Sequence, residues 1–180
     1  QAKDLGQLPV GQNIVVIGGG MTAIDIAIQI KRLGANNVTM AYRRGKEHMN
    51  ASHEEQEFAL SEGVHIAHWA QPVSLQVKQG VITGVEFKRA NIEGDETFTT
   101  PADMLFKAIG QSLAPIDVGA VEFVKHYGKY EVDNELRTSH PGIWAGGDCV
   151  AGNDGLAVSA VQDGKLAALS IHNTLTQSQV

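Results

Sequence analysis

Short apolar runs and one amphipathic segment alternate over the first part of the chain. Residues 13–17 form a β-branched run that stops at three consecutive glycines, which indicates a short buried strand ending in a turn. Apolar residues recur near helical spacing over residues 22–33, and Gly34 predicts the end of that helix. Residues 38–42 form a second strand-like run. This order predicts a parallel strand pair, because a helix-length crossover returns the chain in the same direction.

The pattern changes in the middle of the chain. Residues 53–61 indicate a more polar helix, and residues 64–69 a third strand. Three further strand-like runs are joined by turns too short for helices; they lie at residues 73–77, 81–87 and 96–99. We therefore expect an α/β fold, a Rossmann-like parallel sheet that carries an antiparallel β-meander.

The last part of the chain has a looser pattern. An apolar strand is predicted over residues 102–109, ending at Gly110. A hairpin is predicted around Gly128, a strand around residues 143–146, and a long helix over residues 155–175.

Composition excludes several classes of partner. The 180 residues, 43% hydrophobic and 19% charged, are typical of a globular protein with either one well-packed domain or one domain and part of a second. The net charge of -6 argues against nucleic acid. No apolar run reaches the roughly 18 residues that cross a membrane, so no membrane association is expected. The start lacks Met and an apolar leader, so we expect a cut or processed start and a cytoplasmic location.

Cys149 is the single cysteine. One thiol forms no internal disulfide, no Cys-x-x-Cys pair and no cysteine-ligated iron–sulfur cluster, so electrons must sit on an organic cofactor or leave the chain. We expect this thiol to be inert packing. The seven histidines contain no His-Glu-x-x-His pattern, and no metal site is predicted.

The glycine run has the spacing of a dinucleotide-binding turn. Gly18, Gly20 and Ala23 form a Gly-x-Gly-x-x-Ala pattern between the first strand and the first helix. Gly18 permits the tight turn, Gly20 lets a pyrophosphate approach the backbone, and Ala23 keeps the helix close to the sheet. The helix N-terminus at Met21 and Thr22 supplies N–H groups to the anion. The alternative is a glycine-rich turn without a ligand.

Two arginines follow the second strand. An NAD-binding domain normally has Asp or Glu at this position to bind the ribose hydroxyls, but this chain has Arg43 and Arg44 after Tyr42. Guanidinium groups suit a 2′-phosphate, which favours NADPH over NADH as the cofactor. The alternative is a solvated basic pair, and a contribution of Lys46 stays open.

These motifs resemble the nucleotide domain of two-dinucleotide-binding flavoproteins of the pyridine nucleotide-disulfide oxidoreductase-like superfamily. Residues 17–25, 42–44 and 49–52 are most similar to the small subunit of NADPH-dependent glutamate synthase and the NAD(P)-binding subunit of bacterial dihydropyrimidine dehydrogenase. The sequence of residues 102–111 is slightly more similar to the dihydropyrimidine dehydrogenase subunit than to the glutamate synthase subunit. Asn50 stands where these families have proline, so the loop after the second strand is expected to differ in detail.

Residues 138–148 fit the Thr-x6-Ala-x-Gly-Asp signature of the FAD domain in these flavoproteins. The resemblance implies that Gly147 and Asp148 bind FAD, with the Asp148 carboxylate on a ribitol hydroxyl. It also implies that the helix starting near Leu156 and Ala157 points its N–H groups at the flavin ring. The alternative for Asp148 is a cap on that helix.

The segment with Ala108 and Gly110 resembles the passage from the nucleotide domain back to the FAD domain. The resemblance implies an NAD(P)H-binding domain at residues 1–111 and an incomplete C-terminal part of the FAD domain at residues 112–180. The first FAD glycine turn and a cysteine-rich region would then lie elsewhere in a longer parent. The strand around residues 143–146 would lack its sheet partners and expose apolar surface.

The resemblance implies a parent enzyme that passes hydride from NADPH to FAD and then to iron–sulfur clusters or a partner subunit. The partners would be the remaining FAD and iron–sulfur domains and a larger catalytic subunit. Hydride transfer between the cofactors requires no side chain as acid or base. We expect this portion of the parent enzyme to be inactive alone. Two alternatives stay open: a non-catalytic NADP-binding module, and a stand-alone NADP-dependent dehydrogenase. The second would need a Tyr-x-x-x-Lys pair, which Tyr127 and Tyr130 do not form.

Overall fold

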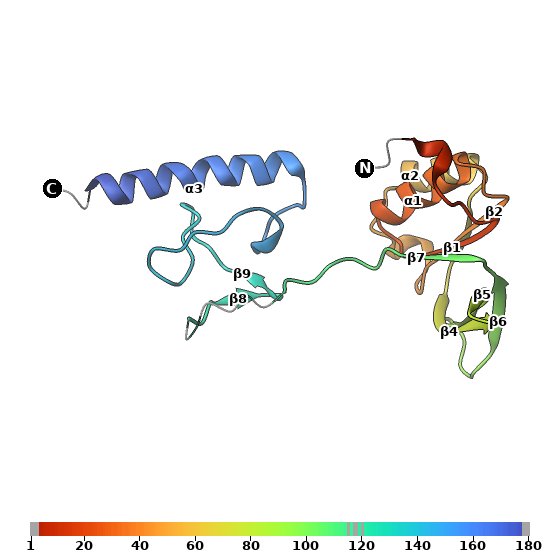
Figure 1. The fold of residues 1–180 in the computed structure, drawn as a ribbon. Helices are drawn as coiled ribbons and strands as arrows, with labels where there is room; N and C mark the ends of the chain where they lie inside the picture. Colours follow the sequence, from red (N-terminus) through yellow and green to blue (C-terminus); the bar gives the residue numbers. More distant parts are fainter. Residues whose placement is uncertain (1–3, 115, 117–118, 120, 178–180) are drawn as a thin grey trace. The chain divides into compact units, whose positions relative to one another are not determined.

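The computed structural model describes residues 4–114, 116, 119 and 121–177. The chain divides into two compact units, Gln1–Gly110 and Gln111–Val180 (Figure 1). Each unit is described by itself. No helix in the described ranges is long and apolar enough to span a membrane.

The first unit is built on a four-stranded parallel sheet. Its order is β3-β2-β1-β7, comprising β1 (Asn13–Ile17), β2 (Asn37–Ala41), β3 (His65–Ala67) and β7 (Met104–Lys107). Every neighbouring pair is parallel, as predicted. The middle of β1 is fully buried because it lies between β2 and β7 and is covered on both faces.

Two helices cover one face of this sheet (Figure 1). They are α1 (Met21–Arg32) and α2 (His53–Ser61), and α2 has the bounds predicted from the sequence. Apolar residues of α1 at helical spacing pack against Val16 and Met40 of the sheet. Ser52 and Glu55 form a reciprocal capping box that fixes the start of α2.

The predicted antiparallel meander is also present. Its strands are β4 (Ala70–Lys78), β5 (Val81–Arg89) and β6 (Thr97–Pro101), in the order β4-β5-β6. Phe87 of β5 is fully buried in a cluster that joins the meander to the other face of the parallel sheet. Its ring stacks on Phe98 with the centroids 5.5 Å apart.

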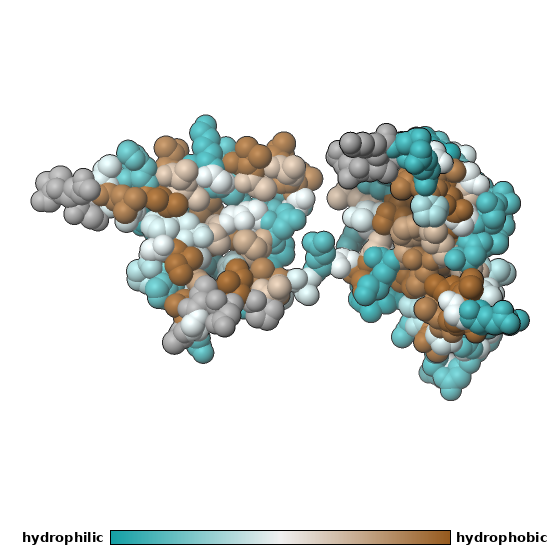
Figure 2. Space-filling view, in the orientation of Figure 1, coloured by the Kyte–Doolittle hydropathy of each residue, from teal (hydrophilic) through white to brown (hydrophobic). Residues whose placement is uncertain are grey.

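The second unit contains little sheet. A hairpin of β8 (Lys125–His126) and β9 (Lys129–Tyr130) is followed by a short 3-10 helix, η3 (Gly147–Cys149), and by α3 (Ala157–Gln177). Figure 2 shows apolar surface along α3, whose most exposed apolar side chains are Val158, Val161, Leu169 and Leu175.

The strand predicted around residues 143–146 is absent from the described structure. Trp144 pairs with Arg137 through one isolated bridge, and no ladder extends from it. The pairing is local, because a turn at Pro141 and Gly142 folds the segment back on the residues just before it. The Trp144 indole N–H donates to Ser170 Oγ at 2.9 Å, so the segment is held by α3 rather than by a strand.

Candidate functional site

The four parallel strands end at the same edge of their sheet (Figure 1). This edge gathers the glycine turn after β1, the Tyr42 segment after β2, and the Ala108 segment after β7. Ligands of open α/β sheets bind outside the carboxyl ends of the strands. The edge is therefore the candidate nucleotide site of the first unit.

Gly18 occupies a position that admits only glycine. Its φ of +152° and its distance to Ala108 are both restrictive, since a Cβ would lie 2.2 Å from the Ala108 carbonyl oxygen. The Gly18 N–H donates to Ala41 O at 3.1 Å, and the Ala108 N–H donates to Ile17 O at 2.8 Å. The turn is thus fastened to both neighbouring strands.

Gly20 differs from Gly18 because its surroundings are open. A Cβ there would meet no atom closer than Asn50 Cβ at 4.0 Å, and no side chain caps α1. Ala23 is buried and its N–H donates to Gly20 O. Within the described structure, the N–H groups of exposed Met21 and Thr22 have no acceptor. The first turn therefore offers free N–H groups and the positive end of the helix dipole to an anion.

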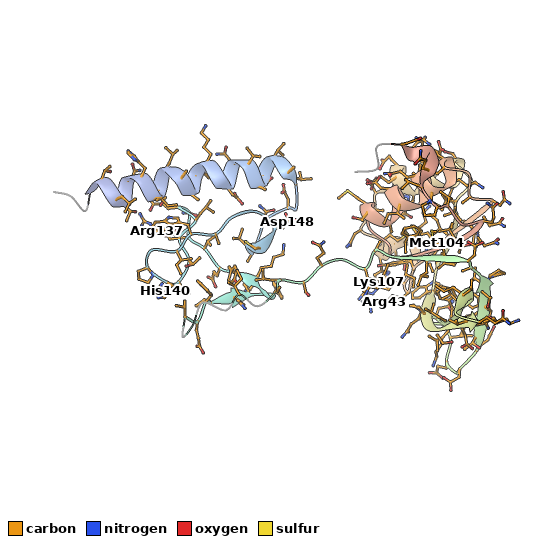
Figure 3. The ribbon with its side chains drawn as sticks, viewed as in Figure 1. Arg43, Met104, Lys107, Arg137, His140 and Asp148 are labelled. Carbon is orange, nitrogen blue, oxygen red and sulfur yellow. The ribbon has the colours of Figure 1, made fainter. Side chains whose placement is uncertain are left out.

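Arg43 and Arg44 are exposed directly after β2. Each of the other arginines forms an ion pair: Arg32 with Glu62 at 2.6 Å, Arg89 with Glu96 at 3.2 Å, and Arg137 with Glu135 at 2.5 Å. Among the described residues, neither Arg43 nor Arg44 has a carboxylate partner. Figure 3 shows Arg43 at the Lys107 end of β7, the end at which the sheet carries the glycine turn.

Glu47 is the acid closest to the two arginines in the sequence, and it is turned elsewhere. Its carboxylate accepts from His48 Nδ1 at 2.8 Å. A hydrogen bond to its own backbone, followed by the bond to His48, holds the pKa of Glu47 below its usual value. The arginines therefore keep their positive charge available to a ligand.

Tyr42 and Lys46 form a Tyr-x-x-x-Lys pair, unlike Tyr127 and Tyr130. The pair does not lie on an α-helix. The Tyr42 hydroxyl donates to the His48 carbonyl oxygen at 2.5 Å. A hydroxyl engaged with the backbone in this way is not presented as an acid to a substrate. The pair therefore gives the stand-alone dehydrogenase alternative no support.

The second unit presents Asp148 on η3, with its side chain exposed (Figure 3). The preceding Gly147 has a φ of +75°, and its N–H donates to Asp163 Oδ2 at 2.8 Å. Asn153 Nδ2 donates to the same oxygen at 2.9 Å. A Cβ on Gly146 would lie 2.7 Å from Asp163 Cβ, so the loop lies directly on α3. Sequence reasoning missed Asp163 and Asn153.

Asp148 does not cap the start of α3. The Leu156 N–H donates to Asp154 Oδ1 at 3.1 Å, and the Gly155 N–H donates to Asn153 Oδ1 at 2.8 Å. Hydrogen bonds from Ser159 and then Leu156 lower the pKa of Asp154. The Leu156 N–H is therefore already used, and Ala157 is the first residue of α3.

The predicted residues fall into two sets. The first unit contains Gly18, Gly20, Met21, Thr22, Ala23, Arg43, Arg44, Ala108 and Gly110. The second unit holds Gly147, Asp148, Leu156 and Ala157.

Several known proteins are similar to this chain in sequence and fold. The small chain of NADPH glutamate synthase from Escherichia coli strain K12 is 35% identical, over 92% of this chain and 39% of that relative. Subunit PreT of NAD-dependent dihydropyrimidine dehydrogenase from Escherichia coli O157:H7 is 32% identical, over 94% of this chain and 39% of that relative. This chain thus spans well under half the length of these curated relatives.

Thioredoxin reductase from T. acidophilum is a structural neighbour, with a TM-score of 0.80 and 27% identity over 95% of this chain and 55% of that chain. The fold is therefore that of the two-dinucleotide-binding flavoproteins, as the sequence motifs predicted. The family model of the pyridine nucleotide-disulphide oxidoreductases matches residues 1–164. The chain belongs to the pyridine nucleotide-disulphide oxidoreductase family.

Proposed function

We propose that this chain is the NADPH-binding portion of a flavin-dependent oxidoreductase of the glutamate synthase or dihydropyrimidine dehydrogenase type. The observation that carries the proposal is the pair of exposed, uncompensated guanidinium groups of Arg43 and Arg44 beside the open glycine turn. A neutral adenosine ribose requires no such charge, whereas a 2′-phosphate does.

The residues of the first unit suit the two anionic parts of the ligand. The N–H groups of Met21 and Thr22 would bind the pyrophosphate, and the open space above Gly20 would admit it. Arg43 and Arg44 follow β2, the strand next to β1, so they would meet the 2′-phosphate of the adenosine ribose. Ala108 and Gly110 would border this site at the end of β7.

The second unit would contribute to a flavin site through Gly147, Asp148 and the start of α3 at Ala157, whereas the Leu156 N–H is already bonded to Asp154. The exposed Asp148 carboxylate has the acceptors that a ribitol hydroxyl requires, and Asp163 holds its loop in place. A bound flavin would supply the hydride-accepting chemistry, with electrons leaving to iron–sulfur clusters or a partner subunit. The residues of this chain bind and orient the cofactors.

The partners of the whole protein follow from the same proposal. They are further FAD and iron–sulfur domains and a larger catalytic subunit, in the cytoplasm. The names of the relatives support this assignment, since one is a small chain and another is a subunit. Those names also include both NADPH and NAD, so cofactor choice is the property to test first.

The experiment is a calorimetric titration of the 180-residue chain with NADPH and with NADH, together with a visible absorption spectrum after incubation with FAD and gel filtration. Clearly tighter binding of NADPH is the expected result, because only NADPH carries the 2′-phosphate. Equal affinities or an NADH preference would remove the proposed role of Arg43 and Arg44. Retained flavin absorbance would count against a non-catalytic module.

A further inference from the structure

Tyr42 lies where the glycine turn meets the segment that carries the arginines. Its ring packs closely against Gly19, since a Cβ on Gly19 would lie 2.4 Å from Tyr42 Cδ2. Its hydroxyl donates to the His48 carbonyl oxygen at 2.5 Å. One half-buried side chain therefore touches both segments at the candidate nucleotide site.

The backbone of Tyr42 is fixed independently of these side-chain contacts. Its N–H donates to Ala67 O at 2.9 Å, and its carbonyl accepts from the Ala70 N–H at 2.9 Å. These bonds connect Tyr42 to the end of β3 and to the start of β4. The ring is thus carried by a backbone that is hydrogen-bonded to two neighbouring strands.

The segment after Tyr42 is held near its start by the Arg44 carbonyl, which accepts from the Trp69 N–H at 3.1 Å, and near its end by the buried Met49 side chain. Arg43 and Arg44 lie in a bend, and a three-residue 3-10 helix, η2 (Lys46–His48), follows. The segment returns to the glycine turn at Ala51, whose N–H donates to Gly19 O at 3.1 Å. The Tyr42 hydroxyl holds the middle of this loop, between the arginines and the Ala51 bond.

We propose that Tyr42 is a positioning residue that sets the distance between the arginine pair and the glycine turn, and so contributes to the discrimination between NADPH and NADH. This inference rests on the proposed function. A dinucleotide joins its 2′-phosphate and its pyrophosphate through one ribose, so the two protein segments must be held at one separation. A loop fixed at that separation before binding loses less conformational entropy when the ligand arrives.

The test uses two small probes, 2′,5′-ADP and 5′-AMP, which differ only in the 2′-phosphate. Tyr42→Phe keeps the ring against Gly19 and removes the hydroxyl. Its affinity for 2′,5′-ADP should fall about three- to tenfold, as expected for one lost hydrogen bond, while its affinity for 5′-AMP changes by less than about twofold. Tyr127→Phe is the matched control, because the Tyr127 side chain is almost fully exposed in the second unit.

Each outcome separates this inference from the proposed function. If the wild-type chain binds both probes equally, the proposed NADPH site is wrong. If the wild-type chain prefers 2′,5′-ADP and Tyr42→Phe keeps the full preference, the arginine site stands and the positioning role of Tyr42 is overturned. An equal loss for both probes, or a lowered Tm with an unchanged ratio, would show that Tyr42 only stabilises the fold.

Discussion

Gly18 at the end of β1 lies directly against Ala108 at the end of β7, so that a Cβ on Gly18 would come within 2.2 Å of the Ala108 carbonyl oxygen. This contact explains the first glycine of the turn by the packing of two strand ends. It also distinguishes the two glycines of the motif. A Cβ on Gly18 would clash with Ala108, whereas a Cβ on Gly20 would meet open space.

Gly18→Ala should therefore reduce stability, while Gly20→Ala should reduce ligand binding. The strained φ and the clash at Gly18 predict a loss of about 2 to 4 kcal/mol in the free energy of unfolding, measured by urea titration with far-ultraviolet circular dichroism. Gly20→Ala, at the N-cap of α1, should cost no more than about 1 kcal/mol of that free energy and should weaken 5′-AMP binding. Similar stability losses in both variants would contradict this division of roles.

Replacing either Arg43 or Arg44 by Ala should weaken NADPH binding by about tenfold or more, because each replacement removes charge-assisted hydrogen bonds to the 2′-phosphate. NADH binding should stay within about twofold, and the difference should shrink at high salt because exposed charges are screened. Arg32→Ala is the matched control. Arg32 lies in the same unit, but its guanidinium is already paired with Glu62 at 2.6 Å. Calorimetry at two salt concentrations decides the matter, and an NADPH affinity that survives both replacements would refute the arginine assignment.

The elements of the first unit were predictable because their determinants are local. A β-branched run, a glycine stop and helical spacing identify β1 and α1, and Ser52 with Glu55 marks the start of α2. The close packing at Gly18 is also expected from one short motif, and the ligand-binding role of Gly20 stays a prediction.

The missed features depend on contacts between distant residues. A strand around residues 143–146 requires a partner strand, which the local apolar pattern does not specify. Asp163 supports Gly147 across 16 positions of sequence, and no short motif encodes that contact. The hydrogen bond of the Tyr42 hydroxyl to a carbonyl is equally invisible in the sequence, because it depends on how the loop folds back.

Asp163→Ala should loosen the loop that presents Asp148. The replacement leaves the Gly147 N–H and the Asn153 amide without their shared acceptor, which predicts a loss of about 1 to 3 kcal/mol in the stability of the second unit. Faster amide hydrogen exchange at Gly147 is the direct measurement. Asp148→Asn is the control, because the exposed Asp148 carboxylate has no hydrogen-bond partner among the described residues and its replacement should leave exchange unchanged. Equal exchange in the two variants would show that Asp163 does not hold the loop.

His68, which follows β3, should make the first unit less stable as the pH falls. Burial lowers the pKa of His68, more than the carboxylate of Glu47 raises it, and Lys46 and His65 lower it further. Its Nδ1 is buried without a hydrogen-bond partner in the described structure. In the unfolded chain the group titrates near its usual value of about 6.5. Below that pH the unfolded state binds more protons than the folded state, so the free energy of unfolding decreases.

The check is urea denaturation at pH 7 and pH 5 for the wild-type chain and for His68→Gln. The wild-type chain should lose more stability between these two pH values than the variant, because Gln binds no proton in either state. His65→Gln is the companion variant, because it removes a neighbour that lowers the pKa of His68 but keeps the buried imidazole. Its loss of stability at pH 5 should persist, unlike that of His68→Gln. If His68→Gln loses as much stability as the wild-type chain on going to pH 5, the buried imidazole is not the group that responds to pH.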